Sequence, residues 1–157
     1  MTGSTDRFPP MDLEWLRWLL DSYALWLERE LIDRSGDMEQ QSERLFLAPF
    51  VVVSHVDSDD PILNYGNRKA LELWEMTWDE FTTTPSRLTA EPMNRDERAR
   101  MLRLVTTHGF ISDYRGVRIS RTGRLFLVEH ATVWNVVDED RGRRGQAATF
   151  SQWTLLE

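Results

Sequence analysis

The segment PILNYGNRKALELWEMTWDEF (residues 61–81) decides the predicted fold of this chain. Its first part, ILNY at residues 62–65, is short and apolar like a strand, and from Asn67 onward the apolar residues recur with the period of a helix. Thr77, which is followed three residues later by Glu80, predicts the capped start of a further short helix. The segment is therefore predicted to pass from a strand directly into two helices.

Three polar side chains stand where the strand meets the first helix: Asn64, Tyr65 and Asn67. We interpret them as one wall of a small chamber, because an aromatic wall with a few convergent polar groups is typical of a small-molecule site. Gly66, which has no Cβ, would let the backbone turn sharply there and aim its neighbours inward. The alternative is structural: Asn67 caps the following helix and Tyr65 packs in the core.

The composition limits what the chain can bind. Its 157 residues suggest one domain with a real core, and 41% hydrophobic with 29% charged residues is an ordinary balance for a soluble protein. The net charge of -7 argues against nucleic acid and against an anionic membrane surface as partners. No secretory signal is recognisable at the start, so a cytoplasmic location is expected. Because Lys69 is the single lysine among many arginines, we expect a bacterial source.

The chain has no cysteine, which excludes disulfides, zinc–thiolate sites and a photochemical flavin–cysteine adduct. His55, His108 and His130 do not stand at metal-ligand spacings, so no metal site is predicted and haem ligation is not expected. The identity of any cofactor stays open.

The remaining sequence predicts an α+β domain. An amphipathic helix over residues 12–34 begins at the N-cap Asp12, and a second helix begins at Asp37 with Gln40 completing a capping box. The other predicted elements are a strand at 50–56, a helix from about 94 to 109, and strands at 110–120, 124–137 and 145–156. Two hairpins that flank a helical crossover predict a five-stranded antiparallel sheet with helices on one face.

The strand at residues 124–137 is apolar on both of its alternating sides, with Phe126, Val128 and Trp134 predicted on the same side. Since a sheet with one solvent face alternates cleanly, both faces must be covered. The helix at 12–34 is the expected cover, and another copy of the chain is the alternative. We therefore divide the chain into a disordered N-terminus (1–10), an N-terminal helical extension (11–47) and the sheet domain (48–157).

This order of elements resembles the PAS fold. More specifically, the stretches SHVDSDDPILNYGNRKALELWEMTWDEF, PSRLTAEPMNRDER, HGFISDYRGVRISRTGRLFLVEHATVWNVV and GQAATFSQW resemble the MEKHLA family of PAS-like domains, and together they cover most of residues 45–155. That family includes stand-alone bacterial proteins and the C-terminus of plant homeodomain–leucine-zipper factors. The resemblance implies a stand-alone sensory or regulatory PAS-like domain that binds a small molecule.

Two further groups of residues are candidates for the ligand site. The first contains Arg87 and Glu91 with Ser86, Arg95 and Arg98. The guanidinium groups of Arg95 and Arg98 could bind a carboxylate or phosphate. Its alternative is an internal ion-pair network in which Glu91 and Asp96 neutralise the arginines. The second group lies on the last strands and consists of Arg118, Glu129, His130, Thr132, Trp134, Asn135, Gln146, Thr149 and Ser151. Either these polar residues satisfy one another across the sheet or a ligand does.

The sequence thus favours a PAS-like domain that binds a small molecule and acts by self-association, as a homodimer, or through a downstream partner protein. Two other functions stay open. One is a small cofactor-independent enzyme, for which Glu129 or Glu91 with His130 would form the acid–base pair. The other is a purely structural dimerisation module.

Overall fold

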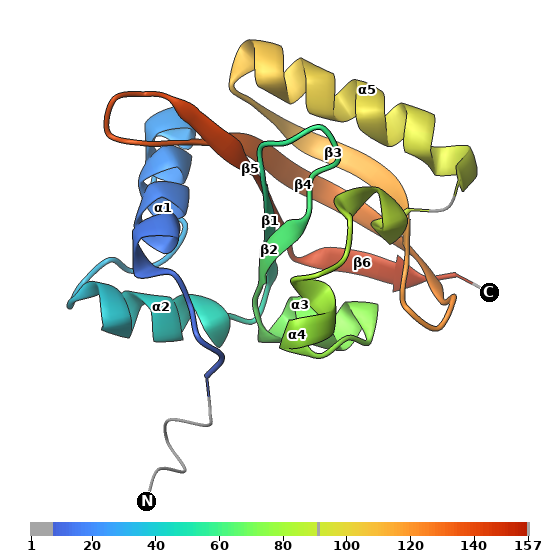
Figure 1. Ribbon diagram of the computed structural model, residues 1–157, viewed down its shortest axis with the longest axis horizontal. Helices are drawn as coiled ribbons and strands as arrows, with labels where there is room; N and C mark the ends of the chain where they lie inside the picture. The colour runs from blue at the N-terminus through green and yellow to red at the C-terminus, as the bar shows by residue number, and fades with distance from the viewer. Residues whose placement is uncertain (1–7, 91, 157) are drawn as a thin grey trace, which may run out of the picture.

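A computed structural model of the chain describes residues 8–90 and 92–156 (Figure 1). Its elements are α1 (Leu13–Leu27), α2 (Met38–Phe46), β1 (Val51–Val56), β2 (Leu63–Gly66), α3 (Arg68–Trp74), α4 (Trp78–Phe81), the 3-10 helix η2 (Ser86–Thr89), α5 (Pro92–His108), β3 (Phe110–Ile119), β4 (Leu125–Val137), β5 (Arg143–Phe150) and β6 (Gln152–Leu155). Residues 1–7 of the predicted disordered N-terminus lie outside the described residues. Phe8 packs edge-on against Phe46, with 5.9 Å between the ring centroids.

The predicted α+β fold with an antiparallel sheet is confirmed. The strand order is β2-β1-β5-β4-β3, and β6 also pairs with β4. The sheet has six strands instead of five because the predicted strand at 145–156 is interrupted. Thr132 lies opposite Thr149 and Glu129 lies opposite Gln152, so β5 and β6 keep one register along β4. The break falls at Ser151, between β5 and β6.

A local irregularity in β4 changes which side chains share a face. His130 has a left-handed backbone with a φ of 55°. Phe126 and Val128, before it, pack in one core cluster with Ala131, after it, whereas Trp134 packs in a different cluster. Strict alternation would have placed Phe126, Val128 and Trp134 on the same face, and that prediction is wrong. The left-handed residue shifts the alternation by one position, as a bulge does.

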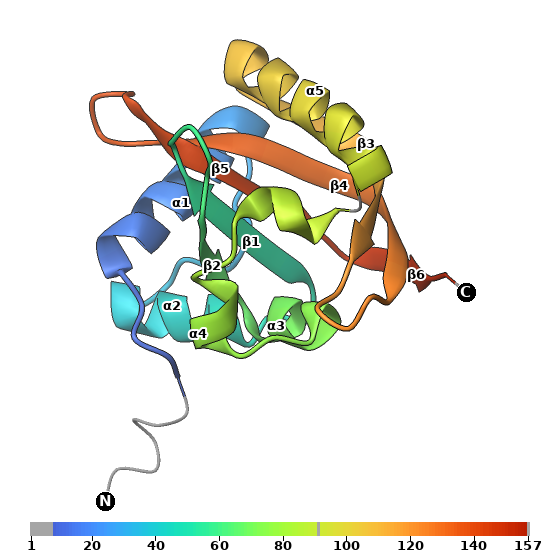
Figure 2. The same ribbon diagram turned by 45° about the vertical axis from the view of Figure 1, so that its right-hand side comes forward.

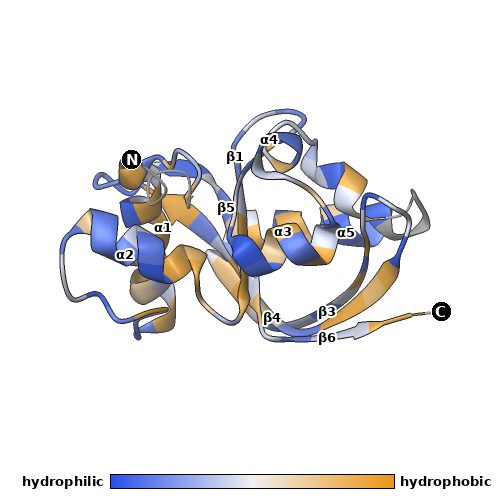
Figure 3. Cartoon of the chain, turned by 90° about the horizontal axis from the view of Figure 1, so that it is seen from below, coloured by the Kyte–Doolittle hydropathy of each residue, from blue (hydrophilic) through white to orange (hydrophobic). Residues whose placement is uncertain are grey.

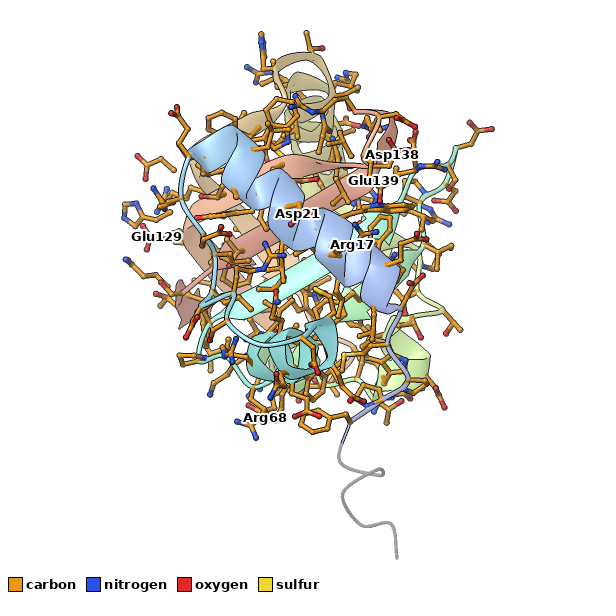
Figure 4. The ribbon with its side chains drawn as sticks, turned by 90° about the vertical axis from the view of Figure 1, so that its left-hand side faces the viewer. Arg17, Asp21, Arg68, Glu129, Asp138 and Glu139 are labelled. Carbon is orange, nitrogen blue, oxygen red and sulfur yellow. The ribbon has the colours of Figure 1, made fainter. Side chains whose placement is uncertain are left out.

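Helices cover both faces of the sheet (Figures 1 and 2). On one side α1 and α2 enclose a core cluster that includes Leu19, Tyr65 and Trp134. On the other side α3, α4 and α5 enclose clusters that include Trp74 and Val105. Viewed from below, the sheet runs between these two groups of helices (Figure 3). The N-terminal helical extension therefore covers the second face within the same chain, and Figure 4 shows α1 lying across the strands.

Helix α1 is shorter than the predicted helix at 12–34. It ends at Leu27, and Glu28 adopts a left-handed backbone with a φ of 57° while its N–H donates to the carbonyl of Ala24. This turn leads the chain toward α2, and Leu31 and Ile32 pack from irregular backbone against the same core cluster as α1. The apolar period continues through residue 31 because these side chains are needed in the core, not because the helix continues.

The predicted helix starts are confirmed. Asp12 accepts a hydrogen bond of 3.1 Å from the N–H of Trp15. Capping boxes form between Asp37 and Gln40 and between Thr77 and Glu80. These caps depend on residues three apart in the chain, and such local chemistry can be read directly from a sequence.

Candidate functional site

A cavity of about 70 Å³ lies between the sheet and the helices of the α5 side. We call it the Arg98 cavity. Its polar lining consists of Ser54, His55, Ser86, Thr89, Arg98, Tyr114, Arg118 and Gln146, and apolar side chains such as Phe81, Met101, Val133 and Phe150 complete it. A volume of this size exceeds the roughly 10–15 Å³ that a single water needs and is far below the ~300 Å³ of the smaller drug-sized pockets. The cavity therefore suits a molecule of a few non-hydrogen atoms.

Arg98 reaches the cavity from the middle of α5. Only 8% of the residue is exposed, and its guanidinium donates to the hydroxyl of Ser86. Ser86 is itself held in η2, where its N–H donates to the carbonyl of Pro61 over 2.8 Å and its own carbonyl accepts from the Thr89 hydroxyl over 2.7 Å. Burial and, to a lesser degree, the nearby charge of Arg118 lower the pKa of Arg98 to about 10. At pH 7 the guanidinium still carries its charge.

His55 enters the cavity lining from β1 and is 6% exposed. Its Nδ1 lies 3.1 Å from the carbonyl oxygen of Val56. Since a carbonyl only accepts, Nδ1 carries the proton in the neutral ring and Nε2 is an acceptor. Burial lowers the pKa of His55 to about 4, so the ring is neutral at pH 7. Nε2 is buried and has no hydrogen-bond partner among the described residues.

Trp74, at the end of α3, presents a second unpaired polar group. The residue is 3% exposed, and its indole Nε1 has no hydrogen-bond partner among the described residues. The ring packs edge-on against Phe126, with 5.1 Å between the centroids, and also contacts Phe81 and Phe150 edge-on. Buried indole N–H groups usually find an acceptor. Within the described residues, the lining therefore includes one residue with an unsatisfied acceptor, His55, and one with an unsatisfied donor, Trp74.

Tyr114 and Arg118 bring β3 to the cavity. The Arg118 guanidinium lies over the Tyr114 ring, 5.7 Å from its centroid, and donates to the Val117 carbonyl over 2.9 Å. The Tyr114 hydroxyl donates to both carboxylate oxygens of Glu97 on α5, at 2.7 and 2.9 Å. Burial raises the pKa of Tyr114, so its hydroxyl keeps its proton and ties β3 to α5.

Four of the predicted candidates line the cavity: Ser86, Arg98, Arg118 and Gln146. The Nε2 group of Gln146 donates to the Leu102 carbonyl over 3.1 Å and to Asn135 Oδ1 over 3.2 Å. Asn135, which lies opposite Gln146 in the sheet, donates to the Val105 carbonyl over 3.0 Å. Of the two interpretations of these strand residues, the structure therefore favours mutual satisfaction for Asn135 and Gln146.

The three polar residues at the join of strand and helix lie outside the lining of the cavity. Asn67 is fully buried and makes four hydrogen bonds: Oδ1 accepts from the N–H groups of Val52 and Ala70, and Nδ2 donates to the carbonyls of Leu45 and Phe50. It acts as a helix cap that also ties down the strand before it.

Tyr65 packs in the α1 core cluster, edge-on to Trp78, and its hydroxyl is buried with no partner in the part of the chain that the structure describes. Asn64 accepts from the Ser54 hydroxyl over 2.7 Å. Segment 61–81 still contributes a wall to the cavity, through its apolar residues Leu63, Trp74 and Phe81. Gly66 serves that wall too, since a Cβ there would lie 2.6 Å from a ring carbon of Phe81.

The other described candidates lie away from the cavity, in the core or on the surface. Trp134 packs in the α1 cluster, and Arg87 pairs with Asp60 on the surface at 3.1 Å. Glu129, at the margin of the molecule in Figure 4, pairs with Arg115 at 3.5 Å. The exposed His130 contacts the carboxylate of Asp113. Glu91 lies outside the described residues. The structure thus brings neither Glu129 nor His130, the acid–base pair of the enzyme hypothesis, to the cavity.

Sequence reasoning did not select His55, Trp74 or Tyr114 for the site. One signal was present: His55 interrupts the apolar strand FVVVSHV, where a polar side chain is buried and needs a partner. Trp74 and Tyr114 carried no such signal, because an aromatic residue in an apolar pattern is usually core.

No helix in the described part of the chain is long and apolar enough to cross a membrane. Within residues 8–90 and 92–156, no group of three or more His, Cys, Asp or Glu side chains is placed to hold a metal ion.

Comparison with solved structures defines the class of fold as PAS. The chain is similar to the crystal structure of the PAS domain of a protein from Colwellia psychrerythraea, with a TM-score of 0.64, 10% identity, and coverage of 76% of this chain and 96% of that one. It is also similar to a light-oxygen-voltage domain studied with a flavin analogue, with a TM-score of 0.57, 12% identity, and coverage of 76% and 85%.

Within that class, the chain belongs to the MEKHLA domain family, whose model matches residues 13–155. The match includes α1 and α2. Two curated relatives are the homeobox-leucine zipper protein ATHB-14 of Arabidopsis thaliana, 23% identical over 151 residues, and HOX29 of Oryza sativa subsp. indica, 26% identical over 145 residues. These matches cover 94% and 89% of this chain, but the chain spans only 18% and 17% of the length of those proteins.

Proposed function

We propose that this chain is a sensory or regulatory PAS-like domain that binds a small molecule in the Arg98 cavity. The observation that carries the proposal is that two residues of its lining, His55 and Trp74, each have a buried ring nitrogen with no hydrogen-bond partner among the described residues. Leaving a buried polar group without a partner costs about 1–3 kcal/mol. A bound molecule that supplied the missing partners would offset this cost and so stabilise the fold.

Nuclear magnetic resonance of the indole N–H groups tests this proposal within one sample. The protein, labelled with ¹⁵N, is titrated with a panel of charged and neutral molecules of two to eight non-hydrogen atoms. A ligand of the cavity is expected to shift the Trp74 indole signal. Trp26 is the internal control, because its indole already donates to the Asn135 carbonyl over 2.9 Å from the α1 side. The proposal fails if no member of the panel shifts Trp74 selectively and saturably.

A variant separates binding in the cavity from binding elsewhere. Ala131 is 3% exposed and lines the cavity, so Ala131→Leu places added atoms in the space that the ligand would occupy. The variant is expected to abolish the Trp74 shift while the other indole signals keep their wild-type positions. A ligand that binds the variant as tightly as the wild type does not occupy this cavity.

We further propose that the domain acts by self-association, as a homodimer, or through a downstream partner protein. Support comes from apolar side chains that are only half buried at the end of the sheet away from α1. Leu125 and Leu127 of β4 lie opposite Ile119 and Val117 of β3, and all four are partly exposed. An exposed apolar patch of this kind often marks an interaction site. On the evidence of composition alone, we also propose a cytoplasmic location and a bacterial source, with neither nucleic acid nor a membrane as a partner.

A further inference from the structure

The charge in the lining of the Arg98 cavity is not balanced. Two arginines, Arg98 and Arg118, line it, and none of the described lining residues is an aspartate or glutamate. Among residues 8–90 and 92–156, no carboxylate lies within ion-pair distance of either guanidinium. The hydrogen bond of Arg98 goes to the neutral hydroxyl of Ser86. Among the described residues, the buried charge of Arg98 therefore has no counter-charge within ion-pair distance, and Asp60 acts on it only from farther away.

Burying a charge without a partner is costly, and proteins usually pair such a group or bind an ion beside it. Burial and the charge of Arg118 both oppose the ionised form of Arg98, and Tyr114 and Asp60 favour it more weakly. An anion in the cavity would reverse both effects, because it would supply the missing charge and screen the two arginines from each other. Guanidinium groups also present several donors in a plane, which matches the two oxygens of a carboxylate.

The other lining groups restrict the anion further. Trp74 adds an N–H donor that has no partner in the described part of the chain. Beside an anion, the ring of His55 takes up a proton more readily and then donates through Nε2. Apolar side chains, including Phe81, Met101 and Val133, form the rest of the wall and would face a hydrocarbon tail. A cavity of about 150 Å³ holds benzene, so 70 Å³ holds roughly half as many non-hydrogen atoms, or a few more if side chains adjust.

We propose that the Arg98 cavity binds a short-chain carboxylate of about the size of acetate or propionate, with its carboxylate group at Arg98 and Arg118 and its tail among the apolar side chains. This inference rests on the proposed function, because it names the ligand class of the same cavity. Inorganic anions lack the tail, and neutral molecules of the same shape lack the charge, so each class can be tested separately.

The test is a set of titrations in which binding is monitored through the Trp74 indole signal and through the melting temperature. The probes are sodium acetate, propionate and butyrate, the neutral analogues acetamide, propionamide and butyramide, and sodium chloride at the same ionic strength. At least one carboxylate is expected to bind saturably and about tenfold or more tightly than its amide, because hydrogen bonds between charged groups are the stronger ones. An amide that binds as tightly as its carboxylate overturns the inference, and so does saturation by chloride without any preference for carboxylates.

Arg98→Gln is expected to weaken carboxylate binding about tenfold or more while leaving amide binding nearly unchanged. Arg103→Gln, on the exposed side of the same helix, is the matched control and should bind like the wild type. If Arg98→Gln does not fold, Arg118→Gln on β3 is used in its place, with the same expected loss of carboxylate affinity. Unchanged carboxylate affinity in the folded arginine variant overturns the inference.

The two proposals fail in different ways. If neutral molecules shift Trp74 and carboxylates do not, the cavity binds a ligand but the carboxylate inference is wrong. If no molecule of either class shifts Trp74, both proposals are wrong.

Discussion

The indole N–H of Trp134 donates a hydrogen bond of 3.2 Å to the backbone carbonyl of Leu19, which joins the middle of the sheet to the middle of α1. Trp134 is fully buried by this contact and packs edge-on against Tyr23, with 4.9 Å between the ring centroids. At the margin of the same face, Arg17 pairs with Glu139 at 2.8 Å (Figure 4). Helix α1 is thus part of the folded core and not an appended segment.

The first prediction follows from that packing. Leu19 is fully buried in the α1 cluster, so Leu19→Ala should lower the free energy of unfolding by about 2–5 kcal/mol. Leu13→Ala, at the exposed start of the same helix (39% exposed), should cost less than about 1 kcal/mol. Urea unfolding of the two variants measures both values. Equal, small losses would mean that α1 is not integral to the core.

The second prediction concerns Asn67. An N-cap substitution to alanine usually costs about 1 kcal/mol, but Asn67→Ala also removes the partners of two buried carbonyls and of one strand N–H. The expected loss in unfolding free energy is therefore about 2–4 kcal/mol. Thr77→Ala, which removes an exposed cap, should cost about 1 kcal/mol.

Ligand affinity provides a second measurement for Asn67. Because Asn67 lies outside the lining of the cavity, the folded fraction of Asn67→Ala should bind small molecules as the wild type does. Reduced affinity with unchanged stability would instead indicate that Asn67 contacts the ligand.

The third prediction is a pH dependence that comes from His55. Its pKa in the fold, about 4, lies below the ordinary value of 6.5, so the unfolded chain takes up this proton first as the pH falls. The stability that depends on neutral His55 is fully present above about pH 6.5 and is lost as the pH falls through about 4. Burial is the main cause, and Arg98 and Arg143 add to it, whereas the hydrogen bond to the Val56 carbonyl and the charge of Asp57 oppose it. The loss amounts to about 3 kcal/mol.

His55→Gln should remove this part of the acid sensitivity, because glutamine does not titrate. His108→Gln, at an exposed position, should follow the wild-type curve. Unfolding free energies are measured from pH 7 to pH 4 for all three proteins. Parallel curves for the wild type and His55→Gln would contradict the prediction.

The fourth prediction tests self-association. The wild type should sediment at micromolar concentration as a dimer, with twice the monomer mass of 18.5 kDa. Leu127→Arg places a charge in the half-buried apolar patch of β4 and should shift the equilibrium toward the monomer. Leu104→Arg, at an exposed leucine on α5 away from this patch, serves as the control. A wild type that sediments as a monomer at all concentrations would exclude the homodimer.

The sequence by itself determined the order of helices and strands, the helix caps and the need for a cover on both faces of the sheet. These features depend on residues a few positions apart, as in the capping boxes of Asp37 and Thr77, or on the period of apolar residues. The cap made by Asn67 was one of two interpretations, and its three-residue spacing from Ala70 is equally local. The family resemblance rests on similarly contiguous stretches and agrees with the match over residues 13–155.

Only the tertiary structure decided which side chains meet in the cavity. The left-handed backbone of His130 shifts the alternation of β4, so Trp134 faces α1 instead of the chamber. Arg98 and His55 come together from α5 and β1, which are distant in sequence, and neither spacing nor period links them. A helix cap is a contact between near neighbours, whereas a cavity depends on how whole elements pack and on which buried groups they leave without partners.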